Sequence, residues 1–254
     1  MKVLAVFADN GMVAKTTLEN IVYTTEKLGV KLEVYKHSYL KKTAKHHLKS
    51  LSKNIDAAMV GFLCVGCRLG MADGIYKTAK KYNVFSVLTG STPFEGKGYK
   101  TNLLKKNGSM LKGYLSKIMK NPRWILNPVA AYIQLMEFFI HFRLLNEHKD
   151  IKYFLPYKEY IEWDEKEIER VLDENLQWKR NPNLKTSWRG DCNIAPIKGY
   201  FYKKMLGFND MEDHLSSLIR AGKITKKEGR ERLKKEGQVD KKYVGKLLSE
   251  IQNS

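Results

Sequence analysis

The segment that most constrains how this chain folds is residues 61–93, GFLCVGCRLGMADGIYKTAKKYNVFSVLTGSTP. It places Cys64 and Cys67, two of the three cysteines, directly before a helical pattern at 68–81. Residues 84–88 follow and are typical of a short strand, which ends in a polar turn of small residues. Helices that alternate with strands characterise α/β proteins, so this segment predicts that class.

The N-terminal residues show the same alternation. Residues 2–8 and 31–35 have the composition of strands, and apolar residues recur at helical spacing across 12–28. Gly29 follows that helical pattern as a helix-terminating residue. Strands separated by helical patterns predict an α/β fold in which a parallel sheet is joined by helical crossovers.

The rest of the chain is predicted to be mostly helical. Further helical patterns occur at 37–52, 163–178, 210–220 and 225–235, and 56–63 fits either a strand or a buried helical turn. Asp164 with Glu167, and Thr225 with Glu228, have the spacing of capping boxes at the starts of two of these helices. The aromatic segment 124–145 carries too many polar residues for a transmembrane helix. It fits a core or partner-binding helix, or alternatively one that lies on a membrane surface.

The chain is strongly basic, with a net charge of +19 over 254 residues. Such a charge favours anionic partners, namely nucleic acid, a nucleotide, a nucleotide-sugar or an anionic membrane surface. A solvated lysine-rich surface is the alternative. The odd number of cysteines and the lack of a signal-peptide pattern predict a cytoplasmic protein, and no transmembrane segment is expected.

Three cysteines, Cys64, Cys67 and Cys192, form a candidate metal site. A Cys-x-x-Cys pair completed by a distant third thiolate suits a [4Fe–4S] cluster with one open iron, or zinc with His or water as fourth ligand. A redox-active pair is a second interpretation. Packing of small buried side chains is a third.

Ligands of parallel α/β sheets bind beyond the carboxyl ends of the strands. The candidate ligand-binding residues at two such ends are Asp9, Asn10, Gly11, Gly90, Ser91 and Thr92. The first three suit a ribose or adenine edge, although an ordinary strand-to-helix turn is the favoured interpretation of these three residues in isolation. The last three, after the 84–88 strand, offer amide and hydroxyl donors to a phosphate.

A third candidate group is the segment 188–192, WRGDC, which holds a cation, a carboxylate and a thiol. Arg189 suits a phosphate, and Asp191 suits acid–base chemistry or substrate positioning. A surface salt bridge is the alternative for both residues.

Taken together, these blocks resemble the PP-loop ATP pyrophosphatase superfamily, and within it the N-acetyl sugar amidotransferase branch. The resemblance is carried by VLAVFADNGM near the N-terminus, by residues 64–95, by SWRGDC, and by HLSSLIRAGKITKKEGRERL at 214–233. It implies an adenine nucleotide alpha-hydrolase-like sheet that lacks its first strand, followed by a mostly helical C-terminal part. The implied division is a nucleotide-binding domain at 1–105, a helical insertion with the Cys192 segment at 106–200, and a helical hairpin at 201–254.

The resemblance implies adenylation chemistry with ATP and magnesium. In the amidotransferase branch the acceptor is an N-acetylated nucleotide-sugar, ammonia comes from a glutaminase subunit, and the product enters surface polysaccharide. In the relatives that thiolate tRNA or desulfurate thiouracil, a three-cysteine cluster handles sulfur. That second activity, with tRNA held by the positive charge, is the alternative function.

The chain departs from the family in one respect: it contains no Ser-Gly-Gly sequence. The family's Ser-Gly-Gly-x-Asp-Ser loop follows its first strand, and the amides of that loop bind the leaving pyrophosphate. We therefore expect weak ATP binding and poor catalysis by this chain alone. Truncation is the favoured explanation, ahead of a split enzyme completed by a separately encoded PP-loop fragment or of lost activity. A non-catalytic subunit that binds nucleotide or nucleic acid is the third functional hypothesis.

Overall fold

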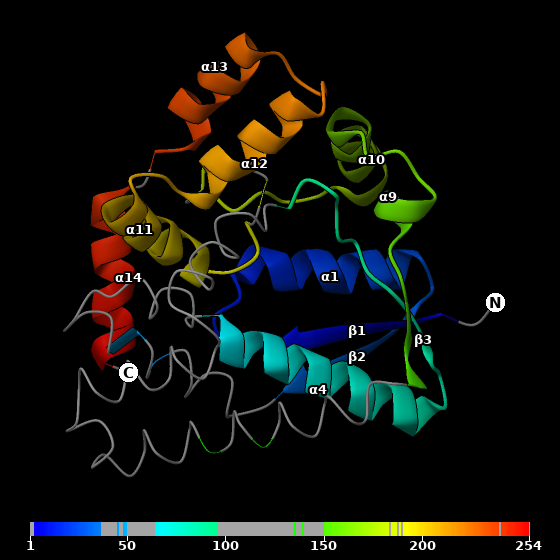
Figure 1. The fold of residues 1–254 in the computed structure, drawn as a ribbon. Coiled ribbons are helices and arrows are strands. Elements are labelled where there is room, and N and C mark those ends of the chain that lie inside the picture. The colour runs from blue at the N-terminus through cyan, green and yellow to red at the C-terminus, as the bar shows by residue number, and fades with distance from the viewer. Residues whose placement is uncertain are drawn as a thin grey trace.

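The computed structural model describes residues 3–36, 64–95, 150–182, 184–186, 188, 190–238 and 240–253, with positions 45, 48, 49, 135 and 139. It has a mixed α/β architecture with small parallel sheets and several helices (Figure 1). The strands are β1 (Leu4–Asp9), β2 (Lys31–Lys36), β3 (Ser86–Leu88) and β4 (Lys152–Phe154). The helices are α1 (Lys15–Lys27), α4 (Val65–Tyr82), α9 (Pro156–Glu159), α10 (Glu165–Leu176), α11 (Ile194–Leu206), α12 (Asp210–Arg220), α13 (Lys226–Glu236) and α14 (Lys241–Asn253).

The N-terminal unit is β1–α1–β2, as the sequence predicts. The two strands pair in parallel, with Leu4 opposite Lys31 and Asp9 opposite Lys36. Helix α1 connects them and is followed by Gly29, whose φ of 61° is the left-handed conformation expected after a helix. In Figure 1, α1 lies above the strand pair and α4 below it.

Helix α4 joins the two halves of the α/β part. On one side the Tyr35 hydroxyl of β2 donates to the Asp73 carboxylate at 2.7 Å. On the other side Tyr76 and Ala79 pack with Ile151, next to β4, and with Val87 of β3. The amphipathic pattern of this helix predicted its existence, and it begins three residues before the predicted start.

The four strands form two separate parallel pairs in the described part of the chain, β1 with β2 and β3 with β4. The sequence predicts a single sheet that contains 84–88, and it does not predict β4. A three-residue strand is too short for a periodic signal, so its pairing with β3 is a tertiary event. No residue of these four strands is fully buried, although parallel strands are ordinarily covered on both faces.

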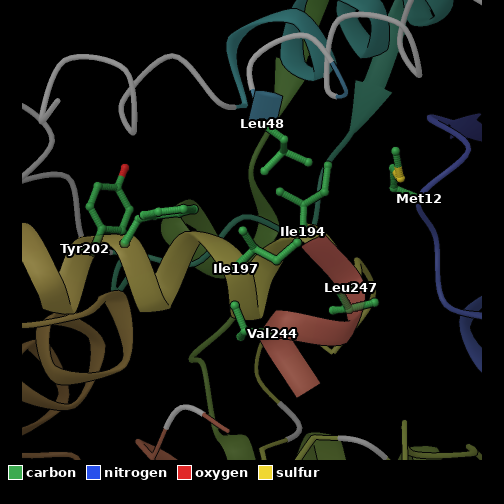
Figure 2. Close-up of a cluster of buried hydrophobic side chains, with 8 residues drawn as sticks. Met12, Leu48, Ile194, Ile197, Tyr202, Val244 and Leu247 are labelled. Atoms are coloured by element: carbon green, nitrogen blue, oxygen red, sulfur yellow. The ribbon is translucent and has the colours of Figure 1, made fainter. Parts of the chain in front are cut away.

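The largest hydrophobic cluster lies between the N-terminal turn and the C-terminal helices (Figure 2). Met12 follows β1, Ile194 and Ile197 come from α11, and Val244 and Leu247 come from α14. Ile197 is completely buried and Val244 is 1% exposed. Chain ends more than 230 positions apart in sequence therefore share one core.

The predicted C-terminal helices form, with most of their predicted caps. Asp164 accepts hydrogen bonds from the amides of Lys166 and Glu167 at the start of α10. The Glu167 carboxylate accepts hydrogen bonds from Arg170 and closes no capping box. Helix α13 does carry the predicted box between Thr225 and Glu228.

Several predicted segments lie outside the described residues, namely 56–63 and nearly all of 37–52 and 124–145. Helices α9, α11 and α14 are additions to the sequence-based prediction. Within the described ranges, none of the helices combines the length and apolar character that crossing a membrane requires.

Candidate functional site

The centre of the candidate site is the turn that follows β1. The Asp9 carboxylate accepts a hydrogen bond from the Gly11 amide, and the Asn10 side-chain oxygen accepts one from the Met12 amide, each at 2.8 Å. Gly11 has a φ of 70°, a conformation that a side chain would strain. The Asp-Asn-Gly sequence therefore folds the turn by its own hydrogen bonds.

The side-chain nitrogen of Asn10 points toward two sulfur atoms. Its Nδ2 lies 3.3 Å from Cys67 Sγ and 3.8 Å from Cys192 Sγ. Asn10 is only 7% exposed, so this amide sits in an interior position. Two of the predicted cysteine ligands are thus brought together, from the first turn of α4 and from a segment 125 residues later.

Backbone hydrogen bonds hold the Cys192 segment against the turn. Cys192 forms an antiparallel bridge with Val13, and the Ala14 amide donates to the Asp191 carbonyl at 3.1 Å. The side chain of Asp191 is exposed. Arg189, the other predicted catalytic residue, lies outside the described residues.

The thiols of this cluster are electrostatically disfavoured as thiolates. Burial raises the pKa of the Cys67 thiol above its ordinary value. The hydrogen bond from Asn10 opposes that rise, while the proximity of Cys64 and Asp191 adds to it. Burial raises the pKa of Cys192 to about 12, so both thiols are neutral at physiological pH unless a cation replaces the protons.

Three thiols and a nearby carboxylate have the donor chemistry of a soft metal or cluster site. In the described part of the chain, however, no three His, Cys, Asp or Glu side chains are grouped so that they could hold a metal ion. What Cys67 and Cys192 share is the Asn10 amide. The three-cysteine metal site therefore stays a prediction.

The second predicted turn lies at the end of β3. The Thr89 amide donates to the Phe154 carbonyl at 3.1 Å, which ties the turn to β4. The hydroxyls of Thr89 and Thr92 are buried and make no hydrogen bond in the structure. Gly90 is exposed and has open space where a side chain would begin. Strand β3 pairs with β4 and not with β1 or β2, so this turn and the Asp9 turn follow strands of different sheets. The two turns therefore do not share one sheet edge among the described strands, although the sequence predicts that they do.

His214 links the other segments and was not among the predicted site residues. Its ring is completely buried and stacks on Trp188, with centroids 4.4 Å apart. Its Nδ1 lies 3.2 Å from the carbonyl oxygen of Phe94, just beyond the second turn. A single histidine on a helix gives no sequence signal for such a position.

Comparison with known proteins identifies no relative: no family model, curated protein or solved structure matches this chain.

Proposed function

We propose that this chain is the major part of a PP-loop ATP-dependent amidotransferase that acts on an N-acetylated nucleotide-sugar for surface polysaccharide synthesis. The acetamido oxygen attacks the α-phosphorus of ATP and pyrophosphate leaves. Ammonia then displaces AMP from the activated carbon, which replaces the carbonyl oxygen by nitrogen. ATP enters as its magnesium complex, and a glutaminase subunit supplies the ammonia.

One observation carries the proposal: the separate sequence blocks that resemble this family contact one another. Asn10 of the first block reaches Cys67 of the second and Cys192 of the third. His214 of the fourth block contacts Trp188 and the Phe94 carbonyl. Contact among the four blocks is the arrangement that one shared active site would require, and it supports the proposal in that sense.

The proposed roles follow the geometry of the turns. Asp9 and Gly11 approach the adenosine, and Asn10 contributes through its backbone because both ends of its side chain are engaged. Gly90, Ser91 and Thr92 donate to the substrate or its phosphates. The exposed Asp191 acts as acid–base or positioning group, with Arg189 on a phosphate, and the three cysteines hold zinc or an iron–sulfur cluster.

The pyrophosphate loop is proposed to come from a separately encoded fragment. Strands β1 and β3 each pair along one edge in the described residues, and none of their side chains is fully buried. Two-stranded sheets have marginal stability on their own. A further strand along such an edge would add main-chain hydrogen bonds and would bury part of the exposed strand. A strand that ends in Ser-Gly-Gly-x-Asp-Ser would place its loop amides beside the Asp9 turn.

Two measurements test this function. Calorimetry with ATP is expected to show weak binding to the chain alone, abolished by Asp9→Ala and unchanged by Asp164→Ala on α10. Pyrophosphate release with UDP-N-acetylglucosamine and ammonium is expected from the complex co-purified with a tagged chain, and not from the chain alone. Equal ATP binding by wild type and Asp9→Ala would refute the proposed nucleotide site. Pyrophosphate release by the chain alone would refute the need for a second fragment.

The alternative is sulfur transfer to or from a nucleobase, and it is favoured by the contact between Asn10 and two cysteines together with the charge of +19. Anaerobic purification followed by an absorbance spectrum separates the two functions. A colourless, iron-free protein eliminates sulfur transfer through a cluster. An inert chain that still binds nucleotide or tRNA would instead indicate a non-catalytic binding subunit.

A further inference from the structure

A cavity of about 490 Å³ lies between residues 182, 184–186 and 188, the start of α11 and the beginning of α14. Its size is within the usual range of small-molecule sites. Ala195 and Pro196 in its wall come shortly after Cys192, and Tyr243 donates to the Asn193 side-chain oxygen at 3.5 Å. The cavity therefore borders the candidate active site through the segment that carries Cys192.

The cavity combines apolar and aromatic walls with hydrogen-bonding groups. Ala195, Pro196 and Met211 provide the apolar part, and Trp188 and Tyr243 provide the aromatic part. Aromatic rings give flat surfaces that pack against C–H groups, and the Tyr243 hydroxyl adds a polar end. These walls suit a ligand with one face that is less polar than the rest of its surface.

The polar lining has groups with remaining hydrogen-bonding capacity. Asp240 Oδ1 accepts from the amides of Lys242 and Tyr243, which leaves its second oxygen for a ligand. Gln238 is exposed at the rim and offers both a donor and an acceptor. Burial raises the pKa of Tyr243, so its hydroxyl stays protonated at neutral pH.

The cavity lining carries a slight excess of negative charge. Asp210 pairs with Lys198 at 2.8 Å, whereas Arg232 is shared between Glu236 at 3.1 Å and Glu165 at 2.6 Å. The remaining charged groups of the lining are Asp240 and Lys185, which have opposite signs. A phosphate would therefore meet like charge, whereas a neutral polyhydroxylated ligand would hydrogen-bond to the same carboxylates.

We infer that this cavity binds a neutral pyranose ring, the sugar portion of the nucleotide-linked substrate. Its C–H groups lie against Trp188 and Tyr243, and its hydroxyls bind Asp240, Gln238 and the phenolic oxygen of Tyr243. The inference rests on the proposed function for the identity of the whole substrate. The sugar subsite itself follows from the shape, lining and charge of the cavity.

Saturation-transfer NMR on the full chain with N-acetylglucosamine tests the subsite without ATP or ammonia. Wild type is expected to transfer saturation to the sugar, and each of two variants to weaken binding about three- to tenfold. Tyr243→Phe removes one hydrogen bond to the sugar, and Asp240→Asn replaces a charged acceptor by a neutral donor. Asp240→Asn keeps an oxygen that caps α14, so the fold is retained. The matched controls are Tyr160→Phe, whose side chain is 73% exposed, and Asp164→Asn, which caps α10.

Absence of transfer, or equal transfer by the cavity variants and wild type, overturns the inference. So does competition by inorganic phosphate or methylammonium, because it would show that the cavity selects charge. Sugar binding without pyrophosphate release by any complex would refute the proposed amidotransferase and leave the sugar subsite supported. Pyrophosphate release that is the same for wild type and the cavity variants would refute the sugar subsite and leave the amidotransferase supported.

Discussion

At the residue scale, Asn10 has the most consequential surroundings. Its oxygen shapes the turn after β1, and its nitrogen is shared by the sulfurs of Cys67 and Cys192. A substitution at such a buried amide leaves its hydrogen-bond partners unsatisfied and out of reach of water. It therefore fixes where the cysteines lie relative to the turn that we assign to adenosine.

The change Asn10→Asp separates these two tasks, because aspartate keeps the acceptor for Met12 and removes the donor to sulfur. We expect a loss of about 1–3 kcal/mol in the free energy of unfolding, measured by urea denaturation. The control is Asp9→Asn, which keeps the acceptor for the Gly11 amide and is expected to change stability by less than about 0.5 kcal/mol. Equal effects of the two variants would contradict the assigned role of the amide.

A second residue-scale prediction concerns Lys198 and Asp210, whose side chains are 5% and 12% exposed and 2.8 Å apart. Lys198→Met removes the Lys198 cation from beside a largely buried carboxylate, so we expect a loss of about 3–5 kcal/mol in the free energy of unfolding, measured with urea. The control is Lys203→Met on the same helix. Lys203 is 50% exposed and bound to Glu212 at 2.8 Å, and its loss should cost less than about 1 kcal/mol. The double variant Lys198→Met/Asp210→Leu should recover much of the stability, and failure to do so would point to another role for Asp210.

At the element scale, the position of α4 depends on the absence of a side chain at Gly74 as much as on its contacts. A Cβ at Gly74 would lie 2.6 Å from Cδ1 of Tyr35, whose ring is held by Asp73. The absence of a side chain there allows α4 to pack closely on β2. Gly245 in α14, by contrast, has nothing within 4 Å of the same position.

These two glycines give opposite predictions for one substitution. Gly245→Ala is expected to stabilise the protein by about 0.5–1 kcal/mol, since alanine has the higher helix propensity. Gly74→Ala gains the same propensity but forces Tyr35 away, so we expect a net loss of about 1–3 kcal/mol. Thermal unfolding of both variants measures the contrast. A stabilising Gly74→Ala would show that α4 does not pack on Tyr35 as described.

The capping box of α13 makes that helix sensitive to acid. Hydrogen bonds from the Thr225 amide and hydroxyl lower the pKa of Glu228 below its ordinary value. A lowered pKa means that the stabilisation is present at neutral pH and is lost as the pH falls through the folded-state pKa. The difference in melting temperature between wild type and Glu228→Gln should therefore be clear at pH 7 and shrink on acidification. Glutamine can still close the box, so a difference that is constant with pH would contradict a contribution from the ionised carboxylate.

At the scale of the whole molecule, the main core connects the two ends of the chain. Met12 packs in the same cluster as Ile197 of α11 and Val244 of α14, which come from all three of the predicted domains. Elements that share one core lose their packing together when any of them unfolds. The described parts are thus expected to behave as one cooperative unit.

Urea unfolding followed by tryptophan fluorescence and by far-ultraviolet circular dichroism tests this expectation. Trp163 and Trp188 report on the surroundings of His214, whereas circular dichroism reports on all helices. We expect coincident transitions with one midpoint. Two separated midpoints would show that the C-terminal helices unfold on their own.

Local features of the fold are well predicted from the sequence. The periodicity of 12–28 and 68–81 identifies α1 and α4, and Thr225 with Glu228 marks the start of α13. Helix α11 is not predicted from the sequence, because it is apolar on several faces and shows no clear hydrophobic stripe. Helix α14 has its buried Val244 and Leu247 at helical spacing, so a periodicity search extended to the C-terminus would have found it.

What the sequence alone determined is the set of candidate residues and the elements that carry them, because turns, caps and amphipathic faces depend on neighbours within a few positions. The tertiary structure decided which candidates meet. Asn10 reaches Cys67 and Cys192 across 57 and 182 residues, and β3 pairs with β4 where the sequence predicts a single sheet. Contacts at such separations depend on how whole elements pack, and packing is not encoded in any short stretch of the chain.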